Sequence, residues 1–274
     1  MATPSATIDL ERLSDPLAEI VREAGAIALG YFKSGAERWT KADDSPVTEA
    51  DIAVDRFLAA RLPELAPGAG WLSEETADTT ERLDKRLTWV VDPIDGTRAF
   101  IEGAPEWVVS VALVEDGQPV VGMVFDPCND IAFIATRGGG AFRNGVRMAT
   151  PNPAELSGAK VGGPQALLGP LKSYGVQKGR WHYALANRLV KVAAGDLDAA
   201  LARPNAHDWD IAAAHLILEE AGAKLTGFDG AAPTYNRPTT RHGGLIAAPP
   251  ARAQALKDAL HAERDALDAL EPYR

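Results

Sequence analysis

The segment Trp89-Val90-Val91-Asp92-Pro93-Ile94-Asp95-Gly96-Thr97 carries the strongest structural signal in this sequence. Its apolar run ends abruptly in two acids three residues apart, which is typical of a buried strand that presents carboxylates at its tip. The glycine directly after the second acid lets the backbone turn sharply. The segment therefore predicts that Asp92 and Asp95 face one cavity at the end of a strand.

Acids also follow or begin other predicted elements. Glu74 and Glu75 end a short apolar run, and Asp210 lies near the start of a helix predicted from Trp209 to Ala221. Each acid alone could be a helix cap or a turn former. Four carboxylates gathered at one point would repel one another too strongly to stay ionised without a counter-charge. Their joint occurrence favours a site for about two Mg²⁺ ions, which prefer oxygen ligands. The predicted set is Glu74, Asp92, Asp95 and Asp210.

The rest of the chain predicts a mixed α and β fold with an antiparallel sheet. The clearest hairpin joins two apolar runs through the turn Asp116-Gly117. A weakly periodic, proline-containing region after Thr150 suggests two lobes, residues 1–150 and 151–274. The other predicted elements are a helix from Ser14-Asp15-Pro16 to near Gly35, a helix after Thr48, a strand over 87–91, hairpin strands over 108–115 and 120–126, a strand over 131–136, a helix over 184–194, short strands near Ala199 and Leu245, and a final helix from Ala251.

Composition excludes several classes of protein. The 28 basic and 38 acidic residues give a net charge of −10, which opposes binding to a nucleic-acid polymer or an anionic membrane. No run approaches the roughly 18 apolar residues of a membrane span, and the N-terminal residues show no signal peptide, so a cytoplasmic location is predicted. The lone Cys128 and five scattered histidines offer no zinc-type spacing. Any metal must therefore be held by oxygen.

The motifs resemble those of a known family, the inositol monophosphatase superfamily of magnesium-dependent, lithium-sensitive phosphatases. The resemblance covers the first helix to roughly residue 247. It rests on D-P-I-D-G-T at 92–97, E-E at 74–75, W-D-I-A-A at 209–213, Thr48-Glu49-Ala50-Asp51 and Lys41.

This resemblance implies a layered αβαβα sandwich of the inositol monophosphatase and fructose-1,6-bisphosphatase type, with the active site between two lobes and a homodimeric assembly. It implies that Glu74, Asp92 and the Ile94 carbonyl hold one Mg²⁺, and that Asp92, Asp95 and Asp210 hold a second. Glu74 is also expected to take part in catalysis by reaching a third ion through water. Two or three Mg²⁺ ions are thus expected.

The resemblance further implies hydrolysis of a phosphate monoester by a metal-activated water, because the dianionic ester must be neutralised before it can be attacked. Thr97 and its partner Asp51 would orient that water. Backbone N–H groups of Gly96, Thr97 and Arg98 would bind the phosphate at a helix start. Lys41 could touch the phosphate, although a loop lysine is usually solvated.

Two alternatives stay open at this point. A haloacid-dehalogenase-type phosphatase also has paired acids after a strand, but its acids are two residues apart and it leaves W-D-I-A-A without a role. A catalytically lapsed member could bind a metal or ligand structurally. Every motif acid is retained in this sequence, which argues against that second alternative.

Substrate choice depends on residues outside the metal motifs. Seven residues before Asp210, where inositol-type and histidinol-phosphate-type members have a glutamate, this chain has Arg203. A guanidinium prefers a second phosphate or carboxylate. Ala202-Arg203-Pro204 and Asp208 resemble the branch that cleaves 3'(2'),5'-bisphosphate nucleotides. The predicted substrate is therefore 3'-phosphoadenosine 5'-phosphate, then inositol monophosphate, then histidinol phosphate. Trp107, Trp181 and Tyr183 could stack on a base, although such aromatics are more often packing residues.

Overall fold

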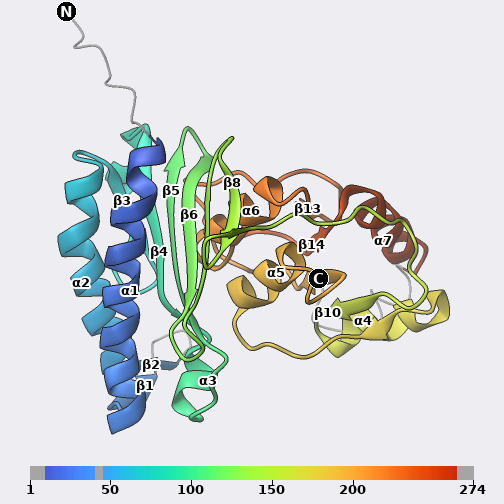
Figure 1. Ribbon diagram of the computed structural model, residues 1–274, viewed down its shortest axis with the longest axis horizontal. Coiled ribbons are helices and arrows are strands. Elements are labelled where there is room, and N and C mark those ends of the chain that lie inside the picture. Colours follow the sequence, from blue (N-terminus) through green and yellow to red (C-terminus); the bar gives the residue numbers. More distant parts are fainter. Residues whose placement is uncertain (1–9, 41–45, 264–274) are drawn as a thin grey trace, which may run out of the picture.

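The computed structural model describes residues 10–40 and 46–263, and these residues form five layers of helices and sheets (Figure 1). Two long helices cover one face of a seven-stranded sheet, and a second helix pair fills the space between that sheet and a five-stranded sheet. A third helix pair covers the far face of the smaller sheet. The predicted αβαβα sandwich is thus confirmed.

The seven-stranded sheet has the order β3-β4-β5-β6-β7-β8-β9. Only β3 and β4 pair in parallel within it, and the predicted hairpin is β5 with β6. The elements of this part are α1 (Leu10–Ser34), β1 (Arg38–Thr40), β2 (Pro46–Thr48), α2 (Glu49–Leu65), β3 (Gly70–Ser73), the 3-10 helix η1 (Thr80–Asp84), β4 (Leu87–Asp95), α3 (Thr97–Ile101), β5 (Val108–Glu115), β6 (Gln118–Asp126), β7 (Ile131–Thr136), β8 (Gly140–Arg143) and β9 (Val146–Arg147).

The five-stranded sheet has the order β11-β10-β12-β14-β13. Its strands β10, β11 and β12 are parallel, whereas β14 runs antiparallel to both β12 and β13. The elements here are β10 (Lys160–Gly162), α4 (Gln165–Leu171), the 3-10 helix η2 (Lys172–Tyr174), β11 (Gln177–Lys178), α5 (Leu185–Ala193), β12 (Ala199–Ala202), α6 (Asp208–Glu220), β13 (Lys224–Gly227), β14 (Leu245–Ala248) and α7 (Pro250–Ala262).

Three apolar clusters of described residues join the layers. One lies between α1, α2 and the larger sheet, one surrounds α5 and α6 between the two sheets, and one lies under α4 and α7. The middle cluster draws residues from both sheets, because α5 and α6 bury apolar side chains on both sides. The division into lobes at residue 150 stays a prediction.

Two predicted boundaries, the start of the first helix and the end of the strand over 87–91, are wrong. The first helix begins at Leu10 and includes Pro16, because its buried stripe already starts with Leu13, 7% exposed. The helix predicted after Thr48 ends at Leu65. Strand β4 extends beyond Val91 to Asp95, so that the motif acids are the last residues of the strand itself. No helix among the described residues combines the length and apolarity needed to cross a bilayer.

Two glycines of α1 test how closely this helix packs on the sheet. A Cβ on Gly25 would lie 2.6 Å from the Phe125 ring and 2.9 Å from Pro127, whereas a Cβ on Gly30 would meet nothing within 4 Å. Alanine favours a helix by about 1 kcal/mol over glycine, but overpacking costs about 1–3 kcal/mol. We expect Gly30→Ala to raise the melting temperature and Gly25→Ala to lower it, as calorimetry would measure. A rise in both variants would contradict this packing.

Candidate active site

Asp92 and Asp95 lie at the end of β4, where the strand leaves regular pairing. The register with β5 shifts between the two acids, and α3 begins two residues after Asp95. Gly96 caps α3 with a φ of +98°, and a Cβ there would lie 3.0 Å from the Glu106 carbonyl oxygen. Only glycine combines this backbone conformation with such a close approach. The sequence signal at Gly96 thus has a structural cause.

Glu74 lies beside this strand end because β3 runs parallel to β4. The Glu74 backbone N–H donates to the Val91 carbonyl oxygen at 3.2 Å, one residue before Asp92. The segment around it is held by Asp55 of α2, whose carboxylate accepts hydrogen bonds from the Ser73 and Thr76 hydroxyls. The structure therefore brings Glu74 to the same sheet edge as Asp92.

Thr97 and Asp51 meet next to the motif turn. Asp51 is 1% exposed and belongs to a capping box with Thr48 at the start of α2. The Thr97 hydroxyl lies 3.1 Å from the Ile94 carbonyl oxygen and 3.5 Å from Asp51 Oδ1, and it can donate to either. The predicted partners are thus in contact, and the Ile94 carbonyl lies within reach of the same hydroxyl.

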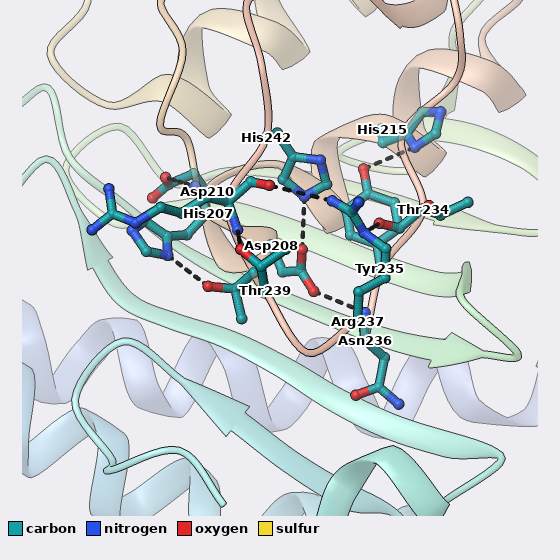
Figure 2. A network of polar contacts seen from close by, with 12 residues as sticks. His207, Asp208, Asp210, His215, Thr234, Tyr235, Asn236, Arg237, Thr239 and His242 are labelled. Atoms are coloured by element: carbon teal, nitrogen blue, oxygen red, sulfur yellow. Dashed lines mark hydrogen bonds and ion pairs between the residues drawn. The ribbon is translucent and has the colours of Figure 1, made fainter. Parts of the chain in front are cut away.

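Asp210 approaches from the opposite side, in the first turn of α6. Its Oδ2 accepts the backbone N–H of His207 at 2.6 Å. Figure 2 shows Asp210 and His207 at one end of a polar network that continues through Asp208. The fully buried Asp208 carboxylate binds His242 Nε2 at 2.7 Å and the backbone N–H of Asn236 at 2.8 Å. This network fixes the helix end that carries Asp210.

Sequence reasoning missed the contact between Asp95 and α5. The two Asp95 oxygens accept the backbone N–H groups of Leu185 at 3.1 Å and Ala186 at 2.6 Å. Nothing in the side chains of Leu185 or Ala186 could have revealed this. It also missed Arg188 of α5, which is 5% exposed and whose charge favours the ionised form of Asp95. Burial lowers the pKa of Arg188 to about 10.

The gathered acids disfavour one another's charge. Burial raises the pKa of Asp92 well above its usual range, and Glu74, Asp95, Asp210 and Asp51 add to that rise. Burial raises the pKa of Asp95 to about 7, despite the N–H groups of Ala186 and Leu185. Lost hydration, followed by the charge of Asp95, raises the pKa of Asp210 well above its usual range. A cation would relieve this repulsion.

No three acidic, histidine or cysteine side chains in the described ranges form a ready-made metal site. The carboxylate and carbonyl oxygens at this place are nevertheless the ligands that Mg²⁺ prefers. Each N–H contact on Asp92, Asp95 and Asp210 occupies only part of the carboxylate, which has about four lone-pair positions. Oxygen ligands therefore remain available. The predicted ligands are Glu74, Asp92, Asp95, Asp210 and the Ile94 carbonyl, and their metal roles stay predictions.

The predicted substrate contacts outside the turn at Gly96 and Thr97 are Arg98, Arg203 and Lys41. Arg98 on α3 and Arg203 after β12 are both exposed. Lys41 lies outside the described residues. Of the candidate stacking residues, Trp107 is fully buried and packs against Phe100. The prediction that such aromatics serve packing therefore fits Trp107, whereas the exposed Trp181 and Tyr183 lie at the surface just before α5.

Comparison with known proteins identifies the family. The model of the inositol monophosphatase family matches residues 9–268. The chain belongs to the inositol monophosphatase family. It is 35% identical to a histidinol-phosphatase of Mycobacterium tuberculosis, over 76% of this chain and 84% of that protein. It is 30% identical to the 3'(2'),5'-bisphosphate nucleotidase CysQ of Aggregatibacter actinomycetemcomitans, over 80% of this chain and 86% of that protein.

A solved structure shows the same fold. The extragenic suppressor protein SuhB of Bartonella henselae superposes with a TM-score of 0.79 at 28% identity, covering 90% of this chain and 97% of that one. As a member of the inositol monophosphatase family, the protein is a phosphatase that hydrolyses phosphoric monoesters. The family is generally Mg²⁺-dependent and acts on small phosphate esters.

The raised pKa of Asp92 predicts an opposition between stability and activity. A carboxyl group whose pKa is raised by folding lowers the free energy of unfolding as the pH rises from about 4 to its folded-state pKa. The loss is about 1.4 kcal/mol for each pKa unit between the two states. We expect metal-free Asp92→Asn to melt several degrees above the wild-type protein at pH 8, and the difference to shrink toward pH 5. Mutation of a residue that only supports a metal ligand typically lowers activity about 10–100-fold. The loss of activity in Asp92→Asn should be larger than that.

The matched control is Asp116→Asn, which makes the same change of charge in the exposed hairpin turn. It should alter neither the melting temperature in EDTA nor the gain in melting temperature on adding Mg²⁺. That gain should be smaller in Asp92→Asn than in the wild-type protein. An Asp92→Asn protein that melts below the wild type at pH 8 in EDTA would refute the electrostatic interpretation.

Proposed function

We propose that this phosphatase depends on two or three Mg²⁺ ions held by Glu74, Asp92, Asp95, Asp210 and the Ile94 carbonyl. The observation that carries the proposal is the mutual rise in pKa of three acids that come from two distant segments. Such a cluster is costly to the metal-free protein and gains stability from divalent cations. Bound Mg²⁺ would supply neutralisation of the ester charge and activation of water at neutral pH.

The chain's own groups would position the reactants. The Thr97 hydroxyl, shared between Asp51 and the Ile94 carbonyl, can orient an attacking water from the side of α2. The backbone N–H groups of Gly96, Thr97 and Arg98 at the start of α3 can donate to phosphate oxygens. Arg98 would add positive charge at the exposed rim of the site.

We propose 3'-phosphoadenosine 5'-phosphate as the lead substrate, on the basis of Arg203. Arg203 follows the last residue of β12 and is exposed seven residues before Asp210. A guanidinium there can bind the non-scissile phosphate, whereas it offers no acceptor to the hydroxyls of a polyol. The likeness to the nucleotidase of Aggregatibacter actinomycetemcomitans supports this choice. A cytoplasmic homodimer remains the proposed setting.

Histidinol phosphate takes the second place, which the sequence alone assigns to inositol monophosphate, because the chain is 35% identical to a histidinol-phosphatase. Inositol 1-phosphate is the third, since an inositol-1-monophosphatase of Mesorhizobium japonicum is 33% identical over 67% of this chain. The cationic Arg203 disfavours histidinol phosphate, whose amine is itself positively charged. The proposal therefore places the bisphosphate nucleotide first.

A panel of these three esters, assayed with Mg²⁺, tests the order. We expect the highest kcat/KM for the bisphosphate nucleotide and inhibition by Li⁺. Arg203→Gln should raise the KM for that nucleotide about fivefold to tenfold, because one charge-assisted contact contributes about 1 kcal/mol or more. Arg56→Gln, on the exposed face of α2, is the matched control and should leave the KM unchanged. Faster turnover of inositol or histidinol phosphate would overturn the order.

A further inference from the structure

A basic pocket lies beside the smaller sheet. Its volume is about 480 Å³, and its lining includes none of the predicted metal ligands. Four cationic side chains and one carboxylate line it, which leaves three positive charges in a chain whose net charge is −10. These side chains are Lys160, Lys178, Arg180, Lys191 and Asp196.

The cations of this basic pocket are poorly neutralised. Lys160 and Lys178 form no ion pair with any residue in the described part of the chain. Asp196 is shared between Lys191 at 3.4 Å and Arg143 at 3.6 Å. Arg180 contacts Glu106 at 2.8 Å, but its side chain is 75% exposed. Solvent around the exposed guanidinium weakens this ion pair, so Arg180 can turn toward an anion in the pocket.

The floor of the basic pocket is formed by paired strands and is partly apolar. Strands β10 and β11 pair in parallel and place Lys160 and Lys178 on adjacent strands. The bare backbone of Gly179 packs against Leu197, since a Cβ there would lie 2.5 Å from Leu197 Cδ2. The hollow is therefore shaped by buried contacts, with the charged groups around it.

His182 adds a buried polar group to the basic pocket. It lines the pocket at 8% exposure, and its Nδ1 is buried without a hydrogen-bond partner among the described residues. Burial lowers the pKa of His182, and Lys191, Arg180 and Arg188 lower it further against the opposing charge of Glu106. The imidazole is thus kept neutral beside several cations. An anion in the pocket would relieve their mutual repulsion.

We propose that the basic pocket binds a phosphate group, either as inorganic phosphate or as part of a small phosphate ester, at a site separate from the acidic one. Its volume lies within the about 300–1,000 Å³ typical of small-molecule sites. Lysine binds phosphate as a point charge. The occupant would also bridge α5 to the smaller sheet, because Lys191 lies on α5 and Lys160 on β10.

Metal-free protein separates the two sites, because without cations the acidic site repels phosphate. In EDTA at constant ionic strength, calorimetry should detect binding of inorganic phosphate or adenosine 5'-monophosphate, and either ligand should raise the melting temperature. The double variant Lys160→Gln with Lys178→Gln should weaken binding about tenfold, since exposed charge pairs contribute up to about 1 kcal/mol each. Both side chains are exposed, so folding should be kept.

The matched control replaces a different pair of exposed lysines, Lys85→Gln with Lys172→Gln, which do not line the pocket. It should bind phosphate as the wild-type protein does. Tighter binding of the nucleotide than of inorganic phosphate would identify an ester as the ligand, and the reverse would identify the free anion. Absence of binding in EDTA, or equal weakening in both double variants, would overturn the proposal.

Discussion

Repulsion between buried carboxylates is the constraint around which this molecule is arranged. Asp92 and Asp95 are 1% and 7% exposed, and they share their surroundings with Glu74 and Asp210. Loss of hydration and like charge both oppose their ionisation. A chain can hold such groups together only if the elements that carry them are anchored by interactions of comparable strength. Here the anchors are the parallel β3–β4 pair and the apolar cluster around α5 and α6.

Backbone N–H groups offset part of this repulsion. The first turn of α5 directs N–H groups at Asp95, His207 at the N-cap of α6 donates to Asp210, and Asp92 accepts the N–H of Ile94. Helix N-termini stabilise negative charge, so the positive ends of two helices from the second half of the chain lie at the acid cluster. The same contacts leave lone pairs free. These N–H contacts thus help the metal-free chain to fold, and they leave carboxylate lone pairs available to a cation.

Local patterns predicted the acids and many of the elements, because both depend on short stretches of sequence. They did not predict β10, α4 and β11, which lie in the weakly periodic region after Thr150. The strand before Asp92, the hairpin around Asp116-Gly117 and the helix after Thr48 all follow from neighbouring residue types. The Asp95 contact to α5 could not be predicted, since its donors are backbone groups about 90 residues away. The N-cap of α5 is Ala184, whose side chain cannot cap a helix. Its cap is supplied by tertiary structure.

The distribution of charge bears on how a phosphate ester reaches the acids. A net charge of −10 repels a dianion at long range, but screening limits that field to about 8 Å at physiological ionic strength. The exposed Arg98 and Arg203 provide local positive charge on α3 and after β12. The basic pocket adds a second positive region around α5. Local cations can therefore outweigh the net charge at short range, so an acidic protein can still select an anionic substrate.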